Sequence, residues 1–380
     1  MQRSDKRILT THTGSLPRPA DLVQMVLAQE RGDAVDEGAL TERIATATRE
    51  IVDQQLQAGV DVVNDGEASK PSYSTYVKDR LNGFGGPSQP PSGSAAEPDF
   101  PDFVRARQAE RLAIAYPTCN GPISIKDATA VQRDIANLKA ALAGKPAVEA
   151  FMSAASPGQI ARFQGNTYYA SDEAYIFALA DAMHSEYRAI VEAGFVLQLD
   201  CPDLASGRTS AYSHLSVADW LKIAAMHVKA LNTAIAGLPA DRIRLHLCWG
   251  NYEGPHTRDV PIRDILPAVF RAKVGGLSFE AANPRHEHEW RVWQDLKLPE
   301  GWVLIPGVLD SCTNYVEHPE LVAQRIVRFA QVAGRENVIA GTDCGFSTSV
   351  GSSRVEPSVA RAKLAAMAEG ACIASRTLWP

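Results

Sequence analysis

Two residues with metal-binding side chains, His246 and Cys248, lie two positions apart at the end of the strand-like run RIRLHLC. Side chains two apart on a strand point to the same side, so both would project from one face. Glu280 ends the later run GGLSFE, and Cys344 ends the run NVIAGTDC. Two thiolates, one imidazole and one carboxylate form a ligand set typical of zinc. The sequence therefore predicts a zinc site made of these four residues.

This ligand set indicates chemistry on sulfur. A thiol bound to zinc loses its proton and becomes a nucleophile at neutral pH, so thiol alkylation is the expected reaction. Four protein ligands leave no open position, and we expect an incoming thiol to displace Glu280, the hardest donor of the set. The alternative interpretation is that His246 and Cys248 are ordinary core residues, because free cysteine is among the most buried residue types.

The composition limits the class of protein. The chain has 380 residues and a net charge of -6, which disfavours nucleic acid and anionic membranes as partners because these attract a basic face. The N-terminal stretch MQRSDKRILTTHTGS lacks the apolar segment of a secretory signal, so we expect a cytoplasmic protein. Its six cysteines are spread along the chain, unlike a disulfide framework, and are free to bind metal.

Short apolar runs alternate with stretches of helical periodicity. The eight runs are 8–15, 60–67, 146–153, 195–200, 242–248, 275–280, 302–310 and 337–344. The clearest helical stretches are 39–58, 171–193, 216–236 and 319–333, the third opened by Ser216 and Asp219 as in a capping box. This alternation predicts an α/β fold, a (β/α)8 TIM barrel forming a single domain over residues 1–380, with its active site at the C-terminal strand ends. A doubly wound open sheet would alternate similarly, but no glycine fingerprint follows the first strand.

One segment, 83–125, departs from the alternation and predicts an irregular insertion after the second strand. Its first part, GFGGPSQPPSGSAAEP, is rich in Gly, Pro and Ser, and indicates an irregular loop. Its second part indicates an additional strand pair outside the barrel. A surface insertion and a lid over the barrel mouth are both compatible with this composition.

Seven segments together resemble one known family. They are TTHTGSLPRP (10–19), VVNDGEA (62–68), LQLDCPDL (197–204), HLCWG (246–250), LSFEAA (277–282), PGVLD (306–310) and GTDCG (341–345). Over nearly the whole chain they are similar to the catalytic C-terminal barrel of cobalamin-independent methionine synthase, and more closely to its short single-barrel relatives. Epoxyalkane:coenzyme M transferase is another relative.

The resemblance implies roles for individual residues. His246, Cys248, Glu280 and Cys344 fall on the zinc ligands of the family. The resemblance places Gly14 and Ser15 at the carboxylate of an amino-acid substrate, and Glu67 and Asp200 at the ammonium of homocysteine. Such a zwitterion needs donors at one end and acidic groups at the other. The alternatives are a plain turn at Gly14 and Ser15, a helix-start carboxylate at Glu67 and an N-cap at Asp200.

The chain also departs from the family pattern. The family has a histidine two residues after the aspartate of PGVxD, proposed as the proton donor to the leaving folate, whereas here Asp310 is followed by Ser311 and Cys312. Asp310 and Cys312 are therefore the residues of this chain at that catalytic position. The folate-stacking tryptophan has at best Phe163 as its counterpart. Both differences make polyglutamyl methylfolate a doubtful methyl donor.

Further histidines lie near the expected barrel mouth. His286 and His288 belong to the charged run RHEHE, which is typical of a solvated helix start. His256 and Tyr252 are equally compatible with a loop and with a substrate contact.

Three functions are compatible with the sequence. The first is a zinc-dependent S-alkyltransferase of methionine biosynthesis, which transfers a methyl group to homocysteine from a small donor. The second is an epoxyalkane:coenzyme M transferase, in which Arg18, Arg208 or Arg285 would bind the sulfonate. The third is a barrel with structural zinc that docks a corrinoid protein. The sequence leaves the donor, the thiol, the fate of Glu280 during turnover and a homo-oligomeric state open.

Overall fold

The computed structural model describes residues 1–89, 99–108 and 114–380. Eight parallel strands form one sheet, in which each strand lies beside the next barrel strand along the chain. In sheet order they are β1 (Leu9–Thr10), β10 (Ile339–Thr342), β9 (Val303–Leu309), β8 (Gly276–Phe279), β7 (Ile243–Leu247), β6 (Val196–Asp200), β5 (Glu149–Ala155) and β2 (Val62–Val63).

The sheet closes on itself between its two ends. The Asp61 N–H donates to the Thr10 carbonyl at 3.2 Å, and the Thr11 hydroxyl donates to the Val62 carbonyl at 3.0 Å. These bonds bring β1 and β2 together, so the sheet forms a nearly closed barrel. The predicted TIM barrel is confirmed, and every barrel strand falls within or overlaps one of the eight apolar runs.

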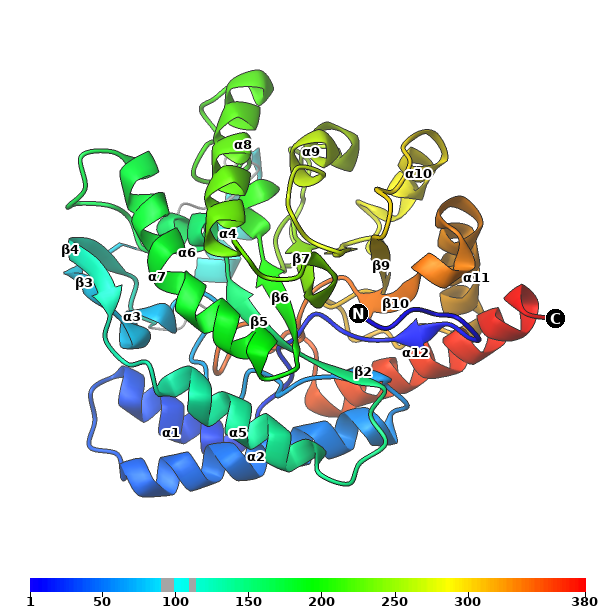
Figure 1. Cartoon of the computed structure of the whole chain (residues 1–380), viewed down its shortest axis with the longest axis horizontal. Helices are drawn as coiled ribbons and strands as arrows, with labels where there is room; N and C mark the ends of the chain where they lie inside the picture. Colours follow the sequence, from blue (N-terminus) through cyan, green and yellow to red (C-terminus); the bar gives the residue numbers. More distant parts are fainter. Residues whose placement is uncertain (90–98, 109–113) are drawn as a thin grey trace.

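Helices surround the strands on the outside (Figure 1). They are α1 (Ala20–Glu30), α2 (Glu37–Gln57), α3 (Val77–Arg80), α4 (Pro101–Gln108), α5 (Ala130–Leu142), α6 (Pro157–Phe163), α7 (Asp172–Glu192), α8 (Val217–Ala234), α9 (Ile262–Val269), α10 (Val292–Asp295), α11 (Pro319–Ala333) and α12 (Pro357–Leu378). The Ser216 hydroxyl caps α8 by accepting the Asp219 N–H at 3.1 Å, as the capping box predicts. Among the described residues, no helix is long and apolar enough to cross a membrane.

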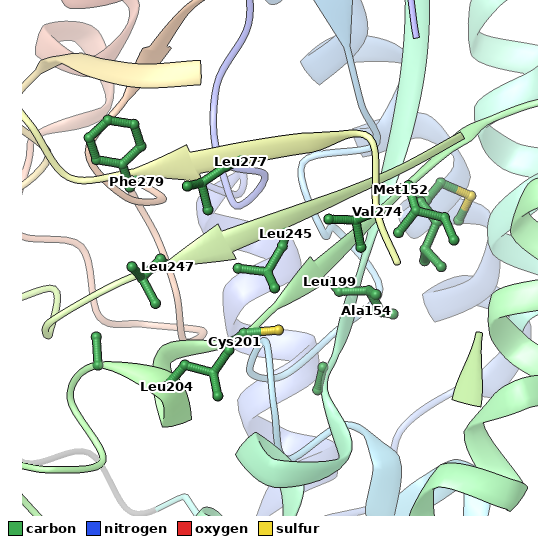
Figure 2. Close-up of a cluster of buried hydrophobic side chains, with 14 of the residues drawn as sticks. Met152, Ala154, Leu199, Cys201, Leu204, Leu245, Leu247, Val274, Leu277 and Phe279 are labelled. Atoms are coloured by element: carbon green, nitrogen blue, oxygen red, sulfur yellow. The ribbon is translucent and has the colours of Figure 1, made fainter. Parts of the chain in front are cut away.

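Successive side chains of β7 point alternately outward to the hydrophobic core and inward to the barrel interior. Leu245 and Leu247 belong to the hydrophobic core between strands and helices, together with residues of the neighbouring strands such as Leu199 (Figure 2). Arg244 and His246 have the opposite parity and point inward. The core that holds the barrel together therefore also fixes the direction of the predicted ligand His246.

The barrel interior contains a buried arginine with neutral partners. Arg244 donates to Gln198 Oε1 at 2.8 Å, to Thr11 Oγ1 at 3.1 Å and to the His12 carbonyl at 2.9 Å, and its guanidinium stacks on Phe151. Burial lowers the pKa of Arg244 to about 9. Gln198 in turn donates to Asp200 Oδ1 at 2.8 Å, so this network reaches the C-terminal end of β6.

The insertion forms a two-stranded antiparallel sheet outside the barrel, made of β3 (Leu81–Ser88) and β4 (Pro117–Ile125), which packs beside α7. The expectation of an irregular loop is wrong for 83–88, which belong to β3, while 90–98 lie outside the described residues. Glycine permits this strand because a Cβ at Gly83 would lie 2.9 Å from the Gly121 carbonyl oxygen of the paired strand.

We predict that Arg244→Ala lowers the free energy of unfolding by about 3–5 kcal/mol, because it leaves buried acceptors without a donor. Urea denaturation followed by circular dichroism measures this loss. Arg49→Ala is the control, since Arg49 is exposed and donates to the Thr46 hydroxyl, and it should change stability by less than about 0.5 kcal/mol. A loss below about 1 kcal/mol for Arg244→Ala would contradict the structural role of this network.

Candidate metal centre and adjoining cavity

Three of the four predicted ligands converge at the barrel mouth. One ligand atom each from His246, Cys248 and Cys344 lies within 4.8 Å of the others, and all three residues are buried. The two sulfur atoms are 3.7 Å apart. At a tetrahedral zinc with bonds of about 2.3 Å, two thiolates lie about 3.8 Å apart. The spacing of the sulfurs therefore fits a shared metal ion.

His246 is oriented for a metal through one nitrogen. Its Nδ1 lies 3.2 Å from the Ser278 hydroxyl on the neighbouring strand β8, whereas its Nε2 is buried and has no hydrogen-bond partner. Burial lowers the pKa of His246 to about 3, so the ring is neutral at neutral pH, the form that ligates metals. A partner on one ring nitrogen and a free second nitrogen are typical of a metal-binding histidine.

Glu280 follows β8 and lies beside this group without belonging to the compact set of three. Its Oε1 accepts the Trp249 N–H at 2.7 Å, and its Oε2 accepts a hydrogen bond from Asn283 Nδ2 at 2.8 Å. The hydrogen bond with Cys344 and burial raise the pKa of the Cys248 thiol, and burial raises the pKa of Glu280. Buried acidic groups packed together need a cation in order to ionise. The chemistry of the donor set therefore also fits a metal ion.

Asp343 fixes the loop that carries Glu280, a role that the sequence analysis did not assign. Its carboxylate accepts the backbone N–H groups of Ala281, Ala282 and Asn283 at 2.7–2.8 Å. Gly307 allows this approach, since a Cβ there would lie 2.0 Å from Asp343 Oδ1. The only signal in the sequence was the place of Asp343 inside the segment GTDCG.

A cavity of about 230 Å³ adjoins the three converging ligands. Two acidic residues, Glu67 and Asp200, also line it. Glu67 Oε1 accepts the Ser153 hydroxyl at 2.6 Å, but Glu67 Oε2 is buried without a partner. Burial, together with the charge of Glu67, raises the pKa of Asp200 well above its usual range. Two buried carboxyl groups with an unused oxygen favour a ligand that brings a positive charge.

The backbone around Glu67 is strained and held in place. Glu67 has a φ of 57°, in the left-handed region that non-glycine residues seldom adopt. Arg18 donates from Nη2 to the Glu67 carbonyl at 2.8 Å and to the Lys70 carbonyl at 2.8 Å. Arg18 therefore stabilises this turn and does not line the cavity, contrary to its proposed contact with a sulfonate. Arg208 and Arg285 do not line the cavity either.

Gly14 and Ser15 differ in their access to the cavity. Ser15 lines it, whereas the Gly14 N–H donates to His12 Nδ1 at 3.2 Å. Gly14 instead permits close packing, because a Cβ there would lie 3.0 Å from Glu67 Oε1. Of the two, Ser15 presents the polar group that a ligand could contact.

Asp310 and Cys312 lie behind the cavity and do not line it. The Asp310 carboxylate accepts the Cys312 N–H at 3.0 Å and the Thr313 N–H at 2.9 Å, which holds the turn after β9. The Cys312 thiol donates to Asn251 Oδ1 at 3.1 Å, and Asn251 lines the cavity. Burial raises the pKa of Cys312, so its thiol stays protonated. Any effect of Cys312 on a ligand would act through Asn251.

A second histidine cluster lies beneath the loop of Trp249. His286 stacks on Trp249 with ring centroids 4.2 Å apart, and its two nitrogens lie 2.9 Å from Glu289 and 3.0 Å from Asp259. The expectation of a solvated His286 is therefore wrong, because this residue is buried, whereas His288 is exposed. Although burial lowers it, hydrogen bonds to Asp259 and Glu289 raise the pKa of His286 to about 10.

The second cluster, His256, Asp259 and His286, also brings possible metal ligands together, but its ring nitrogens already have hydrogen-bond partners. His256 also contacts Asp259, at 2.7 Å, and its Nε2 lies 3.0 Å from the Tyr252 carbonyl. Each ring nitrogen of His256 and His286 therefore faces an acceptor, which is the pattern of two imidazolium cations. In this form the cluster pairs the Asp259 and Glu289 carboxylates with two imidazole rings next to Trp249.

Comparisons with known proteins show which proteins this chain is similar to. The family described as the cobalamin-independent synthase catalytic domain matches residues 167–371. A methionine synthase of Saccharolobus islandicus is 25% identical over 369 residues, covering 95% of this chain and 93% of that protein. A methionine synthase of Thermococcus kodakarensis is 26% identical over 373 residues, covering 97% and 94%.

Solved structures share the fold. A B12-independent methionine synthase from Shewanella sp. W3-18-1, in complex with selenomethionine, aligns with a TM-score of 0.74 at 20% identity, covering 98% of this chain and 99% of that chain. A putative vitamin-B12 independent methionine synthase from Listeria monocytogenes aligns with a TM-score of 0.65 at 18% identity, over 98% and 99%.

We predict that His286→Gln destabilises the protein by about 3–5 kcal/mol, because it leaves the buried carboxylates of Asp259 and Glu289 without one cation. His288→Gln, two residues away and exposed, is the matched control and should have little effect. Urea denaturation of both variants at neutral pH provides the comparison. Equal stability of the two variants would show that the buried cluster contributes nothing.

Proposed function

This chain belongs to the family of the cobalamin-independent synthase catalytic domain, and we propose that it is a zinc-dependent S-methyltransferase that makes methionine from homocysteine. The observation that carries the proposal is a single cavity in which His246, Cys248 and Cys344 converge beside the acidic residues Glu67 and Asp200. A metal-binding group for sulfur and an acidic pair for an ammonium are the two features that homocysteine requires.

His246 Nε2 and the sulfurs of Cys248 and Cys344 would hold the zinc, with Glu280 as the fourth ligand. When bound, zinc lowers the pKa of a substrate thiol and keeps its sulfur as a nucleophilic thiolate. Glu280 retains hydrogen bonds from Trp249 and from Asn283 Nδ2, at 2.7 and 2.8 Å. These bonds would stabilise its carboxylate after an incoming thiol has taken its place.

The acidic pair would orient the amino acid. Glu67 Oε2 has no partner in the structure, and an ammonium placed there would compensate both Glu67 and Asp200. The Ser15 hydroxyl would donate to the carboxylate of the same molecule. The relative from Shewanella is in complex with selenomethionine, an amino acid with the same ammonium and carboxylate and a methylated chalcogen, which supports an amino-acid substrate of this kind.

A thiol methylation assay tests the proposal. Zinc-loaded protein is incubated with homocysteine and, in turn, with methylfolate, with methylcobalamin, free or carried by a corrinoid protein, and with sulfonium methyl donors. We expect methionine from at least one of them. Absence of methionine from all of them would remove the proposed function.

Epoxyalkane:coenzyme M transferase is the second candidate, supported by one observation. Its thiol carries a sulfonate, and the cavity is lined by one arginine, Arg162. The acidic residues Glu67 and Asp200 would have no partner on coenzyme M, which is why homocysteine fits the cavity better. Consumption of propylene oxide in the presence of coenzyme M, but not of homocysteine, would favour this candidate.

We predict that Cys248→Ser and Cys344→Ser each weaken zinc binding by more than about 100-fold, beyond the 10- to 100-fold typical of residues that only orient a ligand. Competition with a chromophoric chelator measures the dissociation constant. Cys372→Ser is the control, because Cys372 is exposed on α12. If all three variants bound zinc equally, the metal site would lie elsewhere.

We predict that Glu67→Gln weakens homocysteine binding by about 10- to 100-fold, the value of a hydrogen bond to a charged group. The same variant should bind 4-mercaptobutanoate, which is homocysteine without its ammonium, as well as the unchanged protein does. Calorimetric titration of zinc-loaded protein with both thiols separates the two cases. A parallel loss for both thiols would indicate a general defect of the cavity instead of an ammonium contact.

A further inference from the structure

The cavity contains a cation that the proposed contacts of homocysteine do not use. Arg162 lies near the end of α6, at the wall that also contains Phe163 and Tyr73. Arg162 is partly buried, and desolvation by the surrounding protein lowers its pKa. A cation placed at a substrate cavity in this way needs a compensating negative charge.

The protein supplies only neutral partners to Arg162. Its Nη1 donates to the Ser206 hydroxyl at 2.7 Å and to Gln159 Oε1 at 3.3 Å, and its Nε donates to the Ser210 hydroxyl at 3.1 Å. Within the described ranges, no carboxylate forms a salt bridge with Arg162, and its Nη2 donates no hydrogen bond. In contrast, the buried Arg80 is paired with both Asp134 and Glu186. The charge of Arg162 is therefore left for a ligand.

Arg162 and the acidic pair lie in different electrostatic surroundings. Asp203 is the nearby carboxylate that favours the charged form of Arg162, but it forms no salt bridge with Arg162 in the described part of the chain. The cations that act most on Asp200 are Lys70 and Arg244. The cavity is therefore lined by the acidic residues Glu67 and Asp200 and by the guanidinium of Arg162, together with the metal ligands.

The part of the cavity around Arg162 also has an aromatic wall. Phe163 packs against Tyr73 in an edge-to-face arrangement, with ring centroids 5.8 Å apart, and the Arg162 guanidinium lies 5.4 Å from the Phe163 ring. Gln159 donates to the Tyr73 hydroxyl at 2.8 Å and accepts a hydrogen bond from Arg162, so it links these two residues. An aromatic surface next to a fixed guanidinium suits a ligand with an apolar part and a terminal oxyanion.

From these contacts we infer that Arg162, with Tyr73, Phe163 and Ser206, forms the subsite for a carboxylate or sulfonate carried by the alkyl donor. This inference rests on the proposed function in one respect, which is that Glu67 and Asp200 bind the acceptor thiol compound. The planar fork of Arg162 would bind the oxyanion through Nη2 while Nη1 and Nε stay fixed by Ser206 and Ser210. Donors without an anionic group would bind more weakly.

Simple thioether probes test the subsite without knowledge of the donor. Zinc-loaded protein is titrated calorimetrically with 3-(methylsulfanyl)propanoate, 2-(methylsulfanyl)ethanesulfonate and the uncharged 3-(methylsulfanyl)propanamide. We expect at least one anion to bind about 10- to 100-fold more tightly than the amide, the value of a charge-assisted hydrogen bond. The preferred anion distinguishes a carboxylate from a sulfonate. Equal binding of all three probes, or no binding by any of them, would overturn the inference.

Variants connect the preference to one side chain. Arg162→Gln should reduce the ratio of anion to amide affinity to near one, whereas Arg208→Gln should preserve it, since Arg208 lies outside the cavity and donates to the Ser213 carbonyl. Arg162→Lys keeps the positive charge but loses the planar guanidinium, so it should retain only part of the preference for the anion over the amide. This variant serves as the test if Arg162→Gln does not fold. An unchanged ratio in the folded Arg162 variants would overturn the inference.

A competition experiment separates the donor from the acceptor. If the subsite serves the donor, saturating homocysteine leaves the affinity for the anionic probe unchanged within about twofold. Displacement of the probe by homocysteine would assign Arg162 to the acceptor carboxylate and overturn the donor subsite. Binding of the anion by protein that does not bind homocysteine would support the subsite while removing the proposed acceptor.

Discussion

The structure depends on satisfying the hydrogen-bonding groups of a buried arginine inside a nearly closed parallel barrel. This arginine is Arg244, and it is held by the acceptors of Gln198, Thr11 and His12 in the barrel interior. His246 lies two residues further along β7, so its side chain also points into the barrel. The ligand therefore inherits its position from a network that also supports the fold, because both depend on the alternation of a single strand.

The loops at the mouth are positioned by hydrogen bonds that involve no ligand. Asp343 accepts three backbone N–H groups of the segment after Glu280, and Glu280 accepts the N–H of Trp249. The imidazolium of His286 stacks on the opposite side of this arrangement, on the Trp249 ring. Because each loop holds its neighbour, the donor atoms come together before a metal binds, which lowers the reorganisation needed for binding.

The sequence allowed the barrel and the convergence of His246, Cys248 and Cys344 to be predicted, because strand alternation and strand ends are local patterns. It did not reveal the burial of His286, since a run such as RHEHE is usually solvated and here depends on the partners Asp259 and Glu289. The strand over 83–88 was also missed, because its glycines are required by the close approach of the paired strand. The importance of Arg162 depends on which partners it lacks in three dimensions, and no sequence pattern contains that information.

The charged groups that line the cavity affect which two reactants can bind in it together. If the acidic pair and the guanidinium were in direct contact, they would form an ion pair and fill the cavity. Here Gln198 donates a hydrogen bond to Asp200 and accepts one from Arg244. Arg162 donates instead to the hydroxyl groups of Ser206 and Ser210. The acidic residues and Arg162 therefore each have hydrogen-bond partners of their own and form no ion pair with each other among the described residues. On the proposed assignment, two reactants of opposite terminal charge would bind in one cavity, and the metal ligands that also line it would hold the reacting sulfur.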